Sequence, residues 1–136
     1  MKLQQIFNKI LKGLQGQKWK KAMCADSETY TGCVYFGDNG SRCAVGHLLP
    51  DKHEFRVREY YNNAPVDELV DCIDDIPDVL NNIEFMGRMQ TFHDDYMATG
   101  SDGKLTPDAS DDLECAAQQY GVKVPDFVKK DLYPRP

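Results

Sequence analysis

The stretch that decides our prediction of the fold runs from Cys33 to Asp51 and reads CVYFGDNGSRCAVGHLLPD. At its centre, Asp38-Asn39-Gly40 supplies residues that tolerate a positive φ, which a tight turn requires. Short β-prone runs lie on either side of this turn, at residues 34–36 and 43–45. The pattern predicts an antiparallel β-hairpin within residues 30–49.

Residues 40–51, GSRCAVGHLLPD, resemble the G-x-[RK]-C-A-[IV]-G-x-L-[IL]-P-D signature of a family of small bacteriophage and prophage proteins. Members of this family often have C-x-Y ahead of the turn, which residues 33–35 match. They also tend to have a later helix ending in L-Q-x-x-H-D, and residues 89–94, MQTFHD, are similar with Met in place of Leu. The resemblance covers roughly residues 30–96 and implies a phage gene product, but it brings no established activity with it.

Outside the hairpin, the spacing of apolar residues predicts helices. Residues 1–23 form an amphipathic basic helix in this interpretation, because the apolar residues from Leu3 to Leu14 recur at helical spacing. Residues 65–97 form a helical pair separated at Pro77, and the second helix of the pair runs from Asp78 to about Met97 with His93 on its inward face. Residues 106–136 form a C-terminal helix, which starts with Thr106 as the N-cap, and a docked tail. We therefore predict an α+β fold, in which a small antiparallel β-hairpin packs on the helices of one mainly helical domain spanning residues 1–136.

Charge is distributed unevenly along the 136 residues, although the net value is only −6. Residues 1–63 contain ten Lys or Arg and six Asp or Glu, whereas residues 64–136 contain six and sixteen. An acidic second half suits a basic partner, such as the nucleic-acid channel of a host enzyme. The alternative is an ordinary solvated surface. The predicted binding residues in the acidic half are Asp67, Glu68, Asp71, Asp74 and Asp75.

The sequence predicts a protein of the bacterial cytoplasm. No apolar run is long enough to span a bilayer, and the first residues lack the apolar stretch and cleavage site of a signal peptide. Five cysteines in such a compartment are expected to be mostly reduced thiols. We expect no cofactor.

One candidate site is a catalytic thiol. Cys43 would be the nucleophile and His93 the base, with Asp94 or Asp95 orienting the imidazole. These are the residue types that deprotonate a thiol and hold the resulting ion pair. The alternative is that Cys43 is a small buried apolar residue.

A second candidate is a zinc site built from Cys33, Cys43 and His47, with Cys24 or His93 as a further ligand. Structural zinc sites usually present their ligands as close pairs such as C-x2-C, and this chain has no such pair, so we expect no metal. A calcium loop around residues 101–105 is excluded, because alanines occupy the positions where an EF-hand needs its first and twelfth ligands.

Two further kinds of contact follow from the basic first half. Nucleic acid could bind a cluster that contains one aromatic residue for stacking: Lys18, Trp19, Lys20, Lys21 and Arg42. The amphipathic N-terminal helix is the first candidate for a homodimer interface, although such a helix more often packs on its own core.

The function that we predict is that of a phage-encoded accessory protein that binds and modulates a host or phage macromolecule, for example as a counter-defence inhibitor. Two alternatives remain open at this stage. One is a small thiol hydrolase that uses Cys43 and His93, and the other is a zinc-stabilised interaction module.

Overall fold

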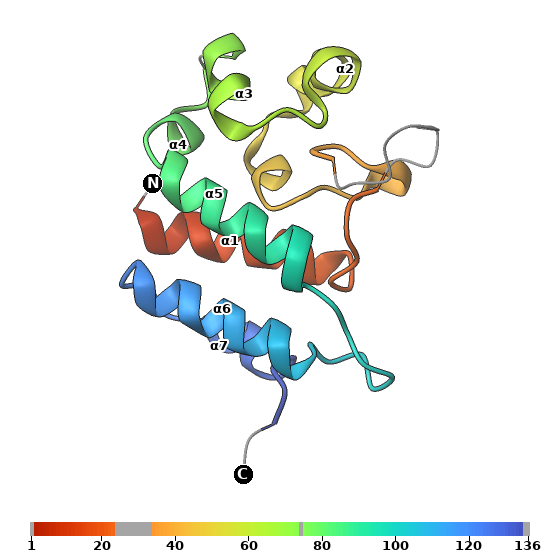
Figure 1. The fold of residues 1–136 in the computed structure, drawn as a ribbon, viewed down its shortest axis with the longest axis vertical. Helices are drawn as coiled ribbons and strands as arrows, with labels where there is room; N and C mark the ends of the chain where they lie inside the picture. Colours follow the sequence, from red (N-terminus) through yellow and green to blue (C-terminus); the bar gives the residue numbers. More distant parts are fainter. Residues whose placement is uncertain (1, 24–33, 74, 135–136) are drawn as a thin grey trace.

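The computed structural model describes residues 2–23, 34–73 and 75–134, which form a mainly helical protein (Figure 1). Its α-helices in chain order are α1 (Leu3–Gly16), α2 (Glu54–Arg56), α3 (Val66–Cys72), α4 (Pro77–Leu80), α5 (Ile83–Thr91), α6 (Pro107–Gln119) and α7 (Asp126–Lys129). The 3-10 helices are η1 (Asp38–Gly40), η2 (Val45–Leu48) and η3 (Asp51–His53), and the π-helical turns are η4 (Val57–Tyr61) and η5 (Phe92–Tyr96). None of the helices in these ranges is both long and apolar enough to cross a membrane.

Helix α1 is the central element of the fold. Its apolar stripe is completely buried and comprises Ile6, Phe7, Ile10, Leu11 and Leu14. Figure 1 shows α1 beside α5, with α6 and α7 on one side of this pair and α2, α3 and α4 on the other. The Phe7 ring meets the Phe85 ring of α5 edge to face, with centroids 6.0 Å apart. This stripe is therefore used within the chain, and the homodimer through the N-terminal helix stays a prediction.

The predicted α+β fold with its β-hairpin is wrong, since the described residues are mainly helical and contain no β-strand. Phe36 and Arg42 form one isolated antiparallel bridge, and Val45, the last residue of the second predicted strand, begins η2 instead. The turn itself is formed as predicted, with positive φ at Asn39 and Gly40. The first four residues of the predicted hairpin, 30–33, lie outside the described part of the chain.

The ladder stops because the backbone of the first predicted strand has other partners. The amide of Val34 donates to the carbonyl of Ala22, and the amide of Tyr35 donates to the carbonyl of Asn62, both over 3.0 Å. The Asn62 side chain completes this pattern, because it accepts from the amide of Phe36 and donates to its carbonyl. The bridge itself has two bonds, from the amide of Cys43 to the carbonyl of Tyr35 over 3.3 Å and from the amide of Gly37 to the carbonyl of Ser41 over 2.8 Å. The next bond of a ladder would run from the amide of Tyr35 to the carbonyl of Cys43, but that amide donates to Asn62 and that carbonyl accepts from His47.

The long helix predicted from Asp78 to Met97 is divided. Helix α4 ends after one turn, and α5 begins after Asn82, which has non-helical φ and ψ. The Asn82 side-chain amide donates to the carbonyl of Asp78 over 2.8 Å, taking a bond that a continuing helix would fill with a backbone N–H.

The C-terminal part packs against α1. Helix α6 begins after Thr106, whose hydroxyl accepts from the amide of Ala109, the cap that the sequence predicts. The carboxylate of Asp131 accepts from Gln15 of α1 and from the indole N–H of Trp19, at 2.8 and 3.1 Å. Val128 is fully buried, so α7 and the chain around it dock on the core.

Candidate functional site

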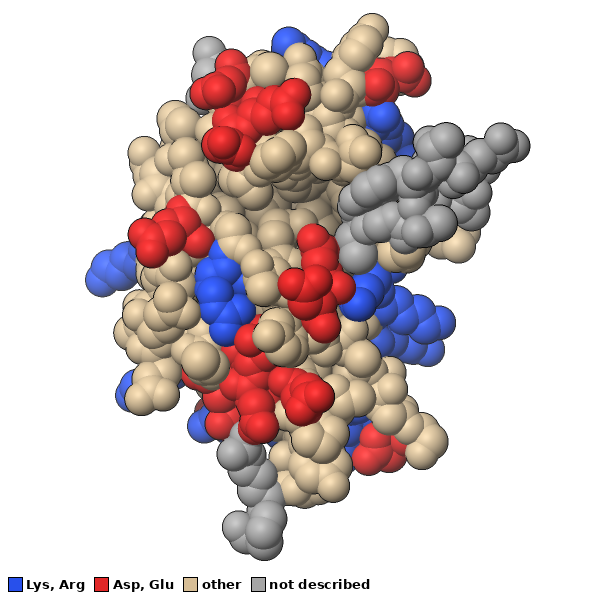
Figure 2. Space-filling view, viewed as in Figure 1, with Lys and Arg blue, Asp and Glu red and all other residues tan. Residues whose placement is uncertain are grey.

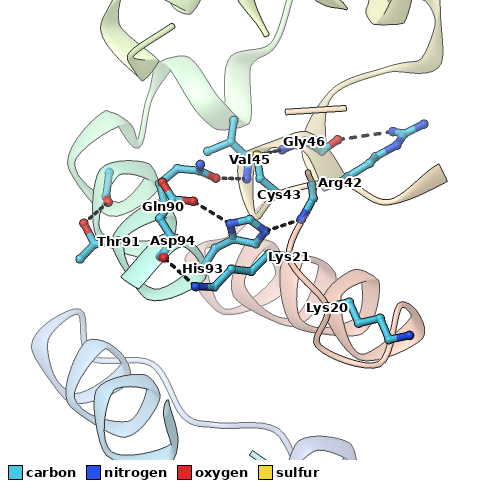
Figure 3. Close-up of polar contacts among 12 residues, drawn as sticks. Lys20, Lys21, Arg42, Cys43, Val45, Gly46, Gln90, Thr91, His93 and Asp94 are labelled. Atoms are coloured by element: carbon cyan, nitrogen blue, oxygen red, sulfur yellow. Dashed lines mark hydrogen bonds and ion pairs between the residues drawn. The ribbon is translucent and has the colours of Figure 1, made fainter. Parts of the chain in front are cut away.

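The structure joins the two segments that carry the phage-like motifs, although they are far apart in the sequence. The amide of Val45 in η2 donates to the side-chain oxygen of Gln90 in α5 over 2.9 Å (Figure 3). Gly46 is required at this junction, because a Cβ there would lie 2.2 Å from the carbonyl oxygen of Tyr35. Cys43, His93 and Asp94 therefore belong to one structural unit.

His93 is fully buried, and both of its ring nitrogens are engaged. Nε2 accepts from the amide of Ala22 over 3.1 Å, so this nitrogen is unprotonated. The proton consequently lies on Nδ1, which donates to the Asp94 carboxylate over 2.7 Å. The inward orientation predicted for His93 is confirmed. Its bond to Ala22 joins η5 to the chain segment that follows α1.

Cys43 is also fully buried, and its Sγ accepts from the amide of Gly46 over 3.3 Å. Burial raises the pKa of the Cys43 thiol to about 12, and the nearby Asp94 carboxylate adds to this shift. The thiol is therefore neutral near pH 7, whereas a cysteine nucleophile must be a thiolate.

The geometry gives no support to a Cys43–His93 catalytic pair. Neither ring nitrogen of His93 is available to take a proton from Cys43, because one accepts from Ala22 and the other donates to Asp94. A general base has to lie within hydrogen-bonding reach of the proton it removes. Among their side-chain bonds, that of His93 to Ala22 joins η5 to the segment after α1, whereas the bonds of Cys43 to Gly46 and of Asp94 to His93 are local.

The predicted metal ligands are not assembled within the described ranges. Cys33 and Cys24 lie outside them, and no group of three His, Cys, Asp or Glu residues that could hold a metal occurs inside them. The His47 ring packs against Gly13 of α1, and its Nε2 lies 3.0 Å from the side-chain oxygen of Gln17. Burial lowers the pKa of His47 to about 4, and Arg42 and His93 contribute to the shift.

The predicted nucleic-acid cluster is divided between buried and exposed residues. Trp19 is only 3% exposed, so its ring cannot stack on a base. Arg42 donates to the carbonyls of Gly46 and Leu49, pairs with Asp51 and lies over the Phe36 ring. Of the predicted cluster, Lys18 and Lys20 remain exposed, and Lys21 donates to the carbonyl of Asp94.

The predicted acidic binding residues are distributed over two places. Asp67, Glu68 and Asp71 are exposed on α3, the first two in its first turn, where the helix dipole favours negative charge. Asp75 pairs with Lys52 and His53, each over 2.6 Å, and these contacts lower the pKa of its carboxyl. Asp74 lies outside the described residues.

A pocket of about 530 Å³ opens beside α3, and the sequence did not predict it. Its walls come from α3, α5, η5 and the loops at 34–35 and 62–65. The apolar lining includes Val34, Pro65, Val66 and Ile83. Two carboxylates, Asp67 and Asp94, line it as well, whereas no Lys or Arg of the described part of the chain does so. We call it the acidic pocket. Figure 2 shows a recess bordered by acidic side chains in the upper half of the molecule.

The electrostatic potential in the acidic pocket is negative. Tyr35 lines it, and the pKa of this phenol is raised above its ordinary value by burial and by the negative charges around it. Those charges include Asp94, Asp67 and Glu68. An apolar pocket with this potential favours a ligand that combines an apolar stem with a positive charge.

Comparison with family models, with curated proteins and with solved structures finds no match to this chain. The resemblance to phage proteins therefore stays a prediction.

Proposed function

We propose that this protein is a phage-encoded, non-enzymatic accessory protein of the bacterial cytoplasm. In this proposal it binds a basic segment of a host or phage protein and thereby modulates that protein, for example as a counter-defence inhibitor. The observation that carries the proposal is the acidic pocket, where the carboxylates of Asp67 and Asp94 border an apolar lining and no described Lys or Arg is a lining residue. The likeness of residues 40–51 to the phage signature supports the origin.

The ligand that fits the acidic pocket best is an arginine side chain of the partner. Its apolar stem can lie along Val66 and Ile83, and its guanidinium can donate to the carboxylate of Asp67, which is exposed at the rim. Arginine is enriched at protein interfaces and forms directional bonds with carboxylates. Among the described residues no cluster suits a metal ion, so a side-chain cation is the better occupant.

A matched pair of variants tests the pocket. Asp67→Asn removes a rim carboxylate in the first turn of α3, and Asp108→Asn makes the same change in the first turn of α6. Both residues are exposed and both occupy the second position of their helix, so the loss of helix-dipole stabilisation is the same. Only Asp67 lines the acidic pocket.

The probe is a short arginine-containing peptide, compared with the same peptide carrying uncharged citrulline. We expect the arginine peptide to shift the amide resonances of Val66, Gly87 and Gln90, and we expect Asp67→Asn but not Asp108→Asn to weaken this binding severalfold. Equal binding of the citrulline peptide would contradict the proposal. Affinity purification from bacterial cells with the same variants then tests the cellular partner, which Asp67→Asn should lose and Asp108→Asn should retain.

A further inference from the structure

A second pocket has the opposite charge, although it lies in the acidic half of the sequence. It has a volume of about 710 Å³ and is formed by α6, α7 and the residues around them. Four lysines line it against a single acid, Glu114. They are Lys104, Lys123, Lys129 and Lys130. We call it the basic pocket.

The positive charge of the basic pocket is largely uncompensated. Lys129 pairs with Asp126 over 3.2 Å, in an exposed contact that solvent screens strongly. Lys104, Lys123 and Lys130 make no side-chain ion pair with any other described residue. In a chain of net charge −6, such a group of cations marks a place where an anionic ligand is favoured.

The lining between the lysines is mostly aliphatic. It includes Ala117, Val122, Val124 and Leu132, together with the exposed ring of Tyr133. Its lysines come from three places in the chain: the turn before α6, the loop after α6 and the end of α7. A ligand that satisfies both features needs several negative charges along its length and apolar groups between them.

We propose that the basic pocket binds an acidic peptide segment with apolar side chains. Carboxylates of the peptide face the lysines, and its apolar side chains cover the valines and Leu132. A nucleic acid fits less well, because Tyr133 is the one aromatic residue that lines the pocket and base stacking needs aromatic platforms. The volume is within the range of pockets that enclose drug-sized ligands, which corresponds to a few peptide residues.

The two pockets share no lining residue and lie in different parts of the fold. The acidic pocket lies beside α3 and the basic pocket beside α7, and Figure 1 shows these helices on opposite sides of the α1 and α5 pair. The two pockets can then be occupied at once. This inference does not rest on the proposed function, because each pocket is defined by its own residues.

Titration of isotope-labelled full-length protein with three probes tests the inference. The first is a peptide of alternating Glu and Leu, the second is the same peptide with Gln for Glu, and the third is a thymidine oligonucleotide. We expect the Glu peptide alone to shift the amides of Ala117, Val122 and Leu132. Equal binding of the Gln peptide, tighter binding of the oligonucleotide, or no shift with the Glu peptide would each overturn the proposal.

Charge-reversal variants show whether the lysines are used. We expect Lys123→Glu combined with Lys130→Glu to weaken binding of the Glu peptide by at least about tenfold. Lys20→Glu is the control, because Lys20 is exposed, does not line the pocket and points away from the residues around it in Figure 3. Asp67→Asn should leave this binding unchanged, which separates failure here from failure at the acidic pocket. A double variant that binds as well as the wild type would overturn the role of the lysines.

Discussion

The surroundings of Cys43 explain why this thiol should react slowly. Its thiol is fully buried, accepts a hydrogen bond from Gly46 and has a pKa raised to about 12. Near pH 8 such a thiol is almost entirely protonated, and alkylating reagents react with the thiolate. Cys115, by contrast, is exposed on α6.

We therefore expect iodoacetamide at pH 8 to label Cys115 long before Cys43 in the folded protein. Peptide mass spectrometry after timed quenching measures both rates in one sample. Addition of urea should make the two rates similar, because unfolding removes the burial. Fast and selective labelling of Cys43 in the folded state would instead revive the thiol-hydrolase interpretation.

His47 provides a prediction on pH dependence. Its pKa is lowered to about 4 in the folded protein, first by burial and then by Arg42 and His93. The unfolded state therefore binds a proton near the ordinary His pKa of about 6.5, while the folded state does not. The contribution of His47 to the free energy of unfolding is complete above pH about 6.5, and it is lost as the pH falls from about 6.5 towards 4.

We expect the free energy of unfolding to fall by about 1–2 kcal/mol between pH 7.5 and pH 5 because of this group, after allowance for its partial exposure. Urea unfolding at both pH values measures the change. His47→Gln keeps a side-chain amide that can donate to Gln17 but cannot titrate. In this variant the free energy of unfolding should therefore fall less between pH 7.5 and pH 5, by the amount that His47 contributes in the wild type. The same pH dependence in both proteins would contradict the assignment.

Among the elements, α1 depends most on small residues at defined places. A Cβ at Gly13 would lie 2.3 Å from Nδ1 of His47, whereas a Cβ at Gly16 would meet nothing within 4 Å. Both glycines belong to the same helix and neither has a positive φ. The close packing of η2 on α1 therefore explains the glycine at position 13 but not the glycine at position 16.

Substitution of these glycines by alanine should have opposite effects. Gly13→Ala displaces the His47 ring and its bond to Gln17, and we expect a loss of about 1–3 kcal/mol in the free energy of unfolding. Gly16→Ala should be neutral or should stabilise the protein by up to about 1 kcal/mol, because alanine is the better helix former. Urea unfolding compares both variants with the wild type. A stabilising Gly13→Ala would show that η2 does not pack on α1 as described.

The elements that could be predicted from the sequence are those with local signals. The apolar stripe of α1 and the cap at Thr106 depend on residues a few positions apart, and both helices are present. The hairpin failed because the amide of Tyr35 donates to the carbonyl of Asn62, which no local pattern connects to Tyr35. Helical patterning likewise could not show that Asn82 would divide the long helix.

At the scale of the whole molecule, the arrangement of charge differs from its distribution in the sequence. The acidic half of the chain contains the basic pocket, because Lys104, Lys123 and Lys130 converge only after α6 and α7 fold together. The inward position of His93 was predictable from its helix face, but its bond to the amide of Ala22 was not. Sites assembled from several elements escape prediction from one sequence, since spacing along the chain carries no information on which loops meet.

The buried side chains form one cluster that passes through α1, and this leads to a prediction on local stability. We expect the amides of residues 6–14 to exchange with solvent most slowly, because α1 can open only when packing on both of its sides is lost. Helices α2 and α3 should exchange faster, since α2 has no buried residue and only Leu69 and Val70 of α3 are buried. Hydrogen exchange followed by NMR measures these rates. Slower exchange in α6 than in α1 would indicate that the two sides unfold independently.

Trp19 is the single tryptophan of the chain, and its indole is buried where the end of α1 meets Asp131. Its fluorescence therefore reports on that junction alone, with an emission maximum at short wavelength in the folded protein and at longer wavelength after unfolding. Trp19 lines neither pocket. Ligands can therefore be titrated at either pocket without quenching this signal, so a change in emission during such a titration would be an optical sign that binding has moved the core.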